Sequence, residues 1–232
     1  VTALYARRAG LRVTVLEPRA APVDKACGEG VMPSALARLR SLGVDPDGHP
    51  IAGIAYTDGT RRAEARFAVG PGRGVRRTVL QPALLDAACD AGVEMVPGAA
   101  ADMEQGPGWV RAGGVTAAWL AAADGLPSPA RRRRGLEVPA RGRVRFGLRR
   151  HVRVQPWTDL VEVHWAPDAE CYVTPVADDV VGIAMRTSER GRSWSQWLTA
   201  FPVIARRVEG CADGSDRSEE HTSELQSPQS IS

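Results

Sequence analysis

Lysine is almost absent from this chain of 232 residues, and long apolar runs are missing as well. Lys25 is the single lysine, so that nearly all of the 30 basic side chains are arginines. Together with the abundant alanine and glycine, this bias indicates GC-rich coding rather than an adaptation for binding. No apolar run approaches the roughly 18 residues that a membrane span needs, so we expect no stable insertion into a membrane.

The few cysteines exclude two classes of site. They are widely separated, form no C-x-x-C pair and have no histidine at ligand spacing, so we expect neither a disulfide framework nor a zinc site, and no other metal. Reduced thiols are typical of a cytoplasmic protein, which is the location we expect. The four cysteines are Cys27, Cys89, Cys171 and Cys211.

A short apolar run at residues 13–16 is typical of a parallel strand that is covered on both faces. Glu17 stands at the carboxyl end of this predicted strand. In a dinucleotide-binding βαβ unit, an acid at this point accepts hydrogen bonds from the ribose hydroxyls of an adenosine. The preceding segment 2–10 predicts a helix that ends at Gly10.

Both ends of the chain are expected to be cut. The glycine turn that precedes the helix in a complete βαβ unit is not in the sequence, which begins with Val1. At the other end, residues 217–232 change to polar residues without periodicity and resemble the translation of a sequencing-library adapter. We expect residues 211–232 to form a disordered tail without a functional role.

Two motifs carry a resemblance to a known family. Residues 25–30 read K-A-C-G-E-G, with Gly28 and Gly30 in a loop where the backbone can approach a flat ligand closely. Asp124 and Gly125 follow a predicted apolar strand at residues 115–123 and open the run D-G-L-P-S-P-A-R-R-R-R. The two runs resemble the K-x-C-G-x-G and D-G-x-x-S-x-x-R-R motifs of flavin-dependent reductases and monooxygenases of the geranylgeranyl reductase and p-hydroxybenzoate hydroxylase type.

This resemblance implies an FAD-dependent oxidoreductase that takes hydride from NAD(P)H. It also implies a role for each matching residue. The expected roles are Glu17 at the adenosine ribose, Cys27, Gly28 and Gly30 beside the flavin ring, Arg77 on the phosphate side, and Asp124 with Gly125 at the pyrophosphate turn.

The expected fold class is α/β: an incomplete Rossmann-like FAD-binding domain, in which helices cover a parallel sheet, and an antiparallel β-sheet substrate domain. Helical spacing predicts helices at 33–42, 75–92 and 193–201, and Asp58-Gly59 predicts a hairpin turn. From Gly142 onward, alternating apolar residues predict strands. The expected domains are FAD-binding at 1–50 and 75–140, a hairpin at 51–74, substrate-binding at 141–210 and the tail at 211–232.

The expected substrate is a hydrophobic small molecule, such as a prenyl or a polyketide or other aromatic compound, which the enzyme reduces or hydroxylates. Tyr172 and Pro175 match the aromatic-rich run of prenyl reductases, whereas its tryptophan, phenylalanine and lysine are missing here. The alternatives are a nucleotide-binding module without turnover and a non-functional gene fragment. Without the phosphate-binding turn, we expect residues 1–232 by themselves to bind FAD weakly or not at all and to be inactive.

No side chain is predicted to act as a catalytic acid or base. His49, His151 and His164 show no partner pattern in the sequence, and ordinary core or surface placement is expected for them. The four arginines 131–134 lack interleaved aromatic residues and are expected to be a solvated face, so we predict no nucleic-acid partner. The sequence leads to no prediction of the oligomeric state.

Overall fold

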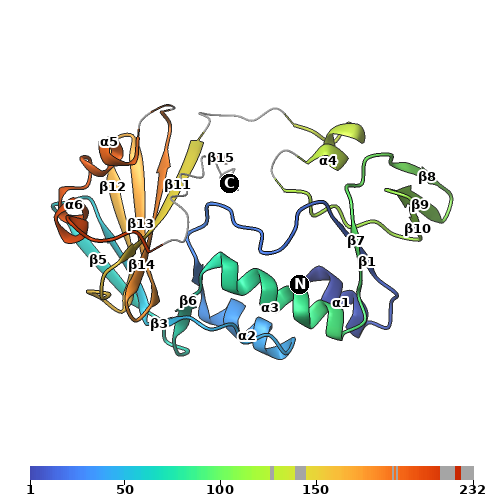
Figure 1. Ribbon diagram of the computed structural model, residues 1–232, viewed down its shortest axis with the longest axis horizontal. Helices are drawn as coiled ribbons and strands as arrows, with labels where there is room; N and C mark the ends of the chain where they lie inside the picture. Colours follow the sequence, from blue (N-terminus) through green and yellow to red (C-terminus); the bar gives the residue numbers. More distant parts are fainter. Residues whose placement is uncertain (126–127, 139–144, 190, 192, 215–222, 226–232) are drawn as a thin grey trace.

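The computed structural model describes residues 1–125, 128–138, 145–189, 191, 193–214 and 223–225. Figure 1 shows two parts: a large sheet with short helices on its outer side, and a helical part with a short parallel sheet. The fold is mixed α/β with parallel and antiparallel sheets, as predicted. No helix within the described ranges is long and apolar enough to cross a membrane.

The parallel sheet has two described strands, β1 (Thr14–Glu17) and β7 (Glu94–Pro97). Three helices pack with these strands: α1 (Thr2–Arg8), α2 (Pro33–Ser41) and α3 (Arg77–Asp90). The predicted helices at 2–10, 33–42 and 75–92 are therefore confirmed, each shorter by one to a few residues at its ends, where hydrogen bonding stops. The buried core between them is Leu4, Leu39, Leu42, Val44, Ala88 and Val93.

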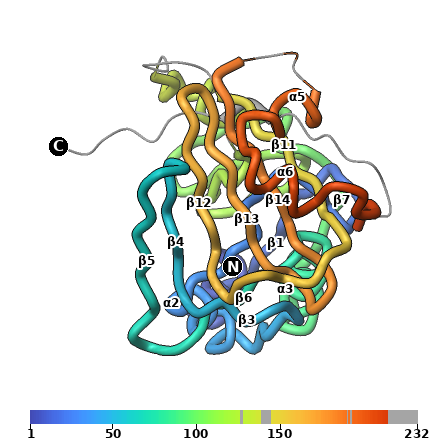
Figure 2. The backbone as a smooth tube through the Cα atoms, turned by 90° about the vertical axis from the view of Figure 1, so that its left-hand side faces the viewer, coloured from blue at the N-terminus to red at the C-terminus, as the bar shows by residue number. Residues whose placement is uncertain are grey.

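The large sheet has the strand order β15-β11-β14-β13-β12-β4-β5. All neighbouring strands are antiparallel except β4 and β12, which run parallel. Figure 2 shows β4 and β5 at one edge of this sheet. The strands are β4 (Gly53–Thr57), β5 (Arg62–Arg66), β11 (Arg145–Arg153), β12 (Leu160–Ala166), β13 (Ala169–Ala177), β14 (Val180–Thr187) and β15 (Ser223–Leu225).

The predicted hairpin is confirmed as β4 and β5. Its turn is held by Asp58, whose carboxylate accepts hydrogen bonds from the backbone N–H groups of Thr60 and Arg61 at 2.9 and 2.7 Å. Gly59 has a φ of +93°, which a glycine adopts without a steric penalty. Because β4 pairs with β12, the hairpin extends the large sheet.

One face of the large sheet is covered by α5 (Trp194–Leu198) and α6 (Pro202–Val208). The predicted helix at 193–201 is thus confirmed in its first part, and Ser193 and Gln196 form a capping box at its start. Alternate residues of the central strands pack against these helices, because successive side chains in a strand point to opposite faces. This core includes Cys171, Val173, Val181, Ile183, Met185, Trp194, Trp197, Phe201 and Ile204.

Smaller elements complete the chain. The predicted strand at 115–123 is confirmed only for residues 115–117, because no described strand lies beside residues 118–125 to pair with their backbone. The start of the predicted β region at 142–144 lies outside the described residues, as does most of the expected tail. These elements are β2 (Gly30–Val31), β3 (His49–Ile51) and β6 (Gly72–Gly74) in one three-stranded sheet, β8 (Glu104–Gly106), β9 (Trp109–Ala112) and β10 (Val115–Ala117) in another, and α4 (Pro129–Arg133).

A buried carboxylate, Glu162 on β12, lies on the helix-covered side of the large sheet. It accepts hydrogen bonds from Arg62 Nη1 and Trp157 Nε1, both at 2.9 Å, and lies 3.3 Å from His164 Nε2. Burial alone would raise the pKa of Glu162, but the hydrogen bonds from His164, Trp157 and Arg62 outweigh it and lower the pKa to about 2.

This lowered pKa predicts a loss of stability in acid. A carboxylate with a depressed pKa stabilises the fold above its unfolded-state pKa, and that contribution disappears as the pH falls toward about 2. A shift of this size corresponds to about 3 kcal/mol. We expect the free energy of unfolding to depend less on pH between about 5 and about 2 in Glu162→Gln than in the wild type. Urea unfolding at several pH values measures this dependence.

The matched control is Glu64→Gln. Glu64 also contacts Arg62, with an oxygen 2.8 Å from Nε, but its side chain is exposed. This variant should keep the pH dependence of the wild type. If the free energy of unfolding falls equally with pH in Glu162→Gln and in the wild type, the lowered pKa of Glu162 is contradicted.

Candidate functional site at the junction of the two parts

The segment that follows β1 crosses from the parallel sheet to the large sheet above α3 (Figure 1). Its first anchor is Val23, which is buried and held by two side chains of α3. The Val23 N–H donates to Gln81 Oε1 at 3.2 Å, and Arg77 Nε donates to the Val23 carbonyl at 3.1 Å. Helix α3 therefore sets the path of this segment before it reaches the large sheet.

The second anchor is Glu29, whose side chain is almost completely buried. Its Oε1 accepts hydrogen bonds from Arg149 Nη1 at 2.5 Å and from the backbone N–H of Arg77 at 3.0 Å. Its Oε2 lies 2.7 Å from His151 Nε2. Glu29 has a φ of +56°, which is unusual for a residue other than glycine and is maintained by surrounding contacts. A Cβ built on Gly182 would lie 2.9 Å from Oε2, so the glycine on β14 makes room for the carboxylate.

Arg149 links Glu29 to Asp24, the residue that follows Val23. While its Nη1 donates to Glu29, its Nη2 donates to Asp24 Oδ1 at 2.6 Å. Only 2% of Arg149 and of His151 is exposed, and both project from β11 on the face opposite α5 and α6. Two carboxylates of the crossing segment thus converge on one guanidinium of the large sheet.

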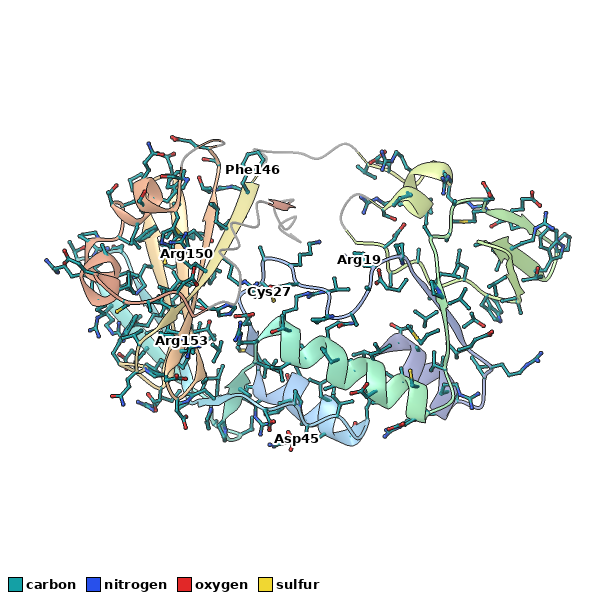
Figure 3. All side chains as sticks on the ribbon, in the orientation of Figure 1. Arg19, Cys27, Asp45, Phe146, Arg150 and Arg153 are labelled. Carbon is teal, nitrogen blue, oxygen red and sulfur yellow. The ribbon has the colours of Figure 1, made fainter. Side chains whose placement is uncertain are left out.

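Between the anchors lies loop 25–28, in which Cys27 and Gly28 are exposed. Figure 3 shows Cys27 in the middle of the molecule, between the large sheet and the helical part. The Gly28 carbonyl accepts a hydrogen bond from Thr174 Oγ1 at 2.8 Å, and the Cys27 sulfur accepts one from the N–H of Glu29 at 3.4 Å. Gly30 follows in β2 and pairs with β6. The predicted residues Cys27, Gly28 and Gly30 therefore lie on one stretch of backbone that contacts β13 and β6.

Glu17 lies at the other end of the crossing segment, at the end of β1. Arg19 donates two side-chain hydrogen bonds to its carboxylate, from Nε at 2.8 Å and from Nη2 at 3.1 Å. These bonds lower the pKa of Glu17, and the nearby positive charge of Arg77 lowers it further. Glu17 is therefore an anion close to Arg77 and on the same connection as loop 25–28.

Asp124 and Gly125 lie in a separate turn before α4. The Asp124 carboxylate accepts hydrogen bonds from Ser128 Oγ at 2.6 Å and from the N–H of Ala130 at 2.9 Å, so it is linked to the first turn of α4. The hydrogen bond from Ser128 is the largest cause of the lowered pKa of Asp124. Gly125 has a φ of +82° and no atom near a built Cβ.

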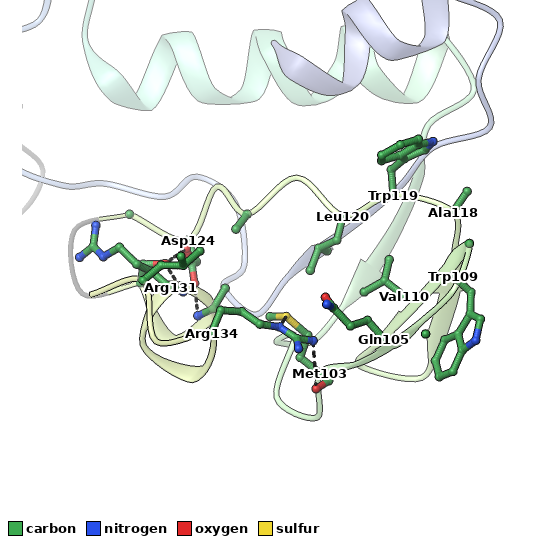
Figure 4. Close-up of a pocket in the computed structure, with 17 residues that line it drawn as sticks. Met103, Gln105, Trp109, Val110, Ala118, Trp119, Leu120, Asp124, Arg131 and Arg134 are labelled. Atoms are coloured by element: carbon green, nitrogen blue, oxygen red, sulfur yellow. Dashed lines mark hydrogen bonds between the residues drawn. The ribbon is translucent and has the colours of Figure 1, made fainter. Parts of the chain in front are cut away.

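This turn lines an open cavity of about 760 Å³ between α4 and the strands β8 to β10 (Figure 4). Its wall combines the Asp124 turn with apolar side chains such as Val110, Trp119 and Leu120. Arg134 projects into it and contacts Met103 (Figure 4). The hydrogen bonds described for Asp124 stay within its own turn, so the structure does not join this turn to loop 25–28 by direct contact.

Sequence reasoning missed the buried network around Glu29. The sequence pattern showed no partner for the histidines, but each has one: His151 contacts Glu29, His164 contacts Glu162, and His49 Nδ1 lies 3.1 Å from Asp178. His151 and His164 are buried, which agrees with the expected core or surface placement. One signal in the sequence could have indicated the network: Arg149 and His151 stand at alternate positions of a predicted strand, so both lie on the same face. The carboxylate partner of Arg149 is 120 residues away in the chain, which no local pattern reveals.

In the part of the chain that the structure describes, no group of three or more histidine, cysteine, aspartate or glutamate side chains could hold a metal ion.

Comparisons with known proteins give a fold but no sequence family. No family model matches the chain, and no curated protein does. A flavoprotein/dehydrogenase from Cytophaga hutchinsonii matches 97% of this chain with a TM-score of 0.75 at 16% identity. CmlS, a flavin-dependent halogenase, matches 97% with a TM-score of 0.76 at 17% identity. The chain has the fold of flavin-dependent enzymes.

Two further structures agree with this fold. A geranylgeranyl bacteriochlorophyll reductase-like protein from Thermoplasma acidophilum matches 97% of the chain with a TM-score of 0.73 at 19% identity. The halogenase PltM, in a mutant form solved in complex with FAD, matches 95% with a TM-score of 0.69 at 14% identity. The chain spans only 63%, 46%, 62% and 57% of the flavoprotein/dehydrogenase, CmlS, the reductase-like protein and PltM, respectively.

Proposed function

We propose that this chain forms the FAD-binding and substrate-covering parts of an FAD-dependent oxidoreductase. The observation that carries the proposal is the position of loop 25–28. It lies between the parallel sheet and the face of the large sheet opposite α5 and α6, within the fold of flavin-dependent enzymes. FAD would supply two-electron transfer, and the chain would bind it, orient it and cover it.

The residues present fit such a cofactor. Gly28 and Gly125 both border open space, because a Cβ built on either one meets no atom within 4 Å. A backbone of this kind leaves room for a flat ring or a pyrophosphate to approach closely. Glu17 offers hydrogen-bond acceptors for the adenosine ribose. The remaining proposed contacts are Cys27 and Gly30 beside the ring, Arg77 on the phosphate side and Asp124 at the pyrophosphate turn.

We propose that the face of the large sheet opposite α5 and α6 contacts a hydrophobic small molecule with a polar group. Thr174, which holds Gly28, shares this face with Tyr172 two residues earlier in β13. Val163 and Ala184 lie opposite Tyr172 on the two neighbouring strands. The Tyr172 hydroxyl donates a hydrogen bond to Glu170 at 2.5 Å. Burial is the larger cause and the Glu170 carboxylate the next, and together they raise the pKa of Tyr172 to about 12. Tyr172 is therefore a neutral hydroxyl beside apolar surface.

We propose NAD(P)H as the reductant, with transfer to a prenyl, polyketide or other aromatic compound by reduction or hydroxylation. This part rests on the resemblance of the K-A-C-G-E-G and D-G motifs. A nucleotide-binding module without turnover would not need a large antiparallel sheet against loop 25–28, so we favour the enzyme. A non-functional gene fragment would show neither selective FAD binding nor an effect of Glu17.

FAD binding tests the proposal, with FMN as the comparison. Because Glu17 and loop 25–28 are in place in this chain, we expect weak, saturable binding of FAD in equilibrium dialysis. We expect Glu17→Ala to weaken FAD binding by about tenfold, the loss of a hydrogen bond to a charged group. FMN lacks the adenosine, so its weaker binding should not change.

The matched control is Glu94→Ala. Glu94 lies opposite Thr14 on the neighbouring strand and accepts a hydrogen bond from its hydroxyl, at the far end of β1 from Glu17. This variant should bind FAD like the wild type. Absence of saturable FAD binding to the folded chain, or equal weakening by Glu17→Ala and Glu94→Ala, would overturn the proposal.

A further inference from the structure

The two acidic residues that flank loop 25–28 share one basic partner from the other part of the molecule. Asp24 precedes the loop and Glu29 follows it, and Arg149 of β11 donates one nitrogen to each, at 2.6 and 2.5 Å. A planar guanidinium presents its donors in a fixed fork, so the two carboxylates are held at a set separation. The ends of the loop are thereby fixed relative to the large sheet.

Further contacts hold Glu29 in the same orientation. His151, two residues along β11, contacts its second carboxylate oxygen at 2.7 Å, and Val75 donates a backbone hydrogen bond to its carbonyl at 2.8 Å. The ion pair between Arg149 and Glu29 is almost fully buried, with 2% and 1% of the side chains exposed. The desolvation of a buried ion pair often costs as much free energy as its attraction provides. The role of this pair is therefore better explained by the single conformation that it specifies.

Loop 25–28 itself has little other support. Cys27 and Gly28 are exposed. From β13, the Thr174 hydroxyl donates a hydrogen bond to the Gly28 carbonyl. An exposed loop whose two ends are fixed loses less conformational entropy when it contacts a ligand, because it is already ordered.

We infer that Arg149 is a positioning residue: it bridges Asp24 and Glu29 so that the large sheet sets the conformation of the backbone of loop 25–28. This inference rests on the proposed function for the identity of the ligand, the flavin of FAD. Arg149 is buried beneath the loop and acts through the two carboxylates, so it is not a catalytic residue. The loop conformation itself does not depend on FAD.

The single lysine of the chain lies in this loop and makes the test direct. A lysine-specific endoproteinase can cut only after Lys25, so its rate reports the opening of loop 25–28 alone. Cleavage of a native protein follows the population of the locally opened state when closing is fast. Arg149→Met leaves the residues around the cleavage site unchanged, and we expect it to raise the rate of cleavage by at least about tenfold.

The control is Arg62→Met. Arg62 also bridges two carboxylates, Glu64 at 2.8 Å and Glu162 at 2.9 Å, at the other edge of the large sheet. Rates are compared at equal fractions of globally unfolded chain, taken from urea unfolding. Equal cleavage of Arg149→Met and Arg62→Met under these conditions would overturn the inference. If Arg149→Met does not fold, Glu29→Gln is used in its place. Faster cleavage than in Arg62→Met supports the inference, and equal cleavage overturns it.

Excess FAD separates this inference from the proposed function. Protection of Lys25 by FAD in the wild type, together with rapid cleavage in Arg149→Met, supports both. Rapid cleavage in Arg149→Met without protection by FAD supports the role of Arg149 and contradicts FAD as the ligand of the loop. Protection by FAD with no effect of Arg149→Met contradicts the role of Arg149 and leaves the proposed function standing.

Discussion

Replacing Glu29 by alanine is expected to lower the free energy of unfolding by about 3 to 5 kcal/mol, the usual cost of removing one partner from a buried ion pair. The variant leaves the Arg149 guanidinium and the His151 ring without the carboxylate that they share, in a place that water does not reach. It also removes the acceptor of the Arg77 backbone N–H at the start of α3. Urea unfolding followed by tryptophan fluorescence measures the loss.

Glu209→Ala is the control for this variant. Glu209 is exposed after α6, so its replacement should change the stability by less than about 0.5 kcal/mol. A loss below about 1 kcal/mol for Glu29→Ala would mean that the network is dispensable for folding. The two parts of the molecule would then be held together mainly by apolar contacts.

Gly74→Ala is the second variant with a large expected effect. A Cβ at this position would overlap the carbonyl oxygen of Pro175 and come within 2.9 Å of its carbonyl carbon. The obstacle is backbone on β13, which cannot rotate away as a side chain can. We expect a loss of about 3 kcal/mol, the upper end of the usual cost of overpacking, measured by urea unfolding.

Gly28→Ala is the matched control in the same region. A Cβ on Gly28 meets no atom within 4 Å, so we expect a change in stability of less than about 1 kcal/mol, and in either direction. Similar stabilities for Gly74→Ala and the wild type would show that β6 and β13 can separate without cost. In that case the close approach of the two strands would not hold loop 25–28 in place.

The sequence by itself determined α1, α2, α3 and α5 and most strands of the large sheet, but not α6. Apolar spacing in 33–42 and 75–92 predicts α2 and α3, and Asp58-Gly59 predicts the hairpin, because each of these signals acts over a few neighbouring residues. The same holds for Asp124, whose hydrogen bonds within the described residues reach no further than Ala130. The motif around Cys27 likewise marked the loop at the junction.

Only the tertiary structure decided what holds that loop. Glu29 lies inside the motif, but its partners Arg149 and His151 come from a strand more than a hundred residues later. Their charges look like ordinary strand surface in the sequence, because alternation indicates two faces and does not show what covers each one. The need for glycine at position 74 is equally hidden, since it depends on the carbonyl of Pro175 from another sheet. Long-range contacts of this kind exist only once both parts have folded against each other.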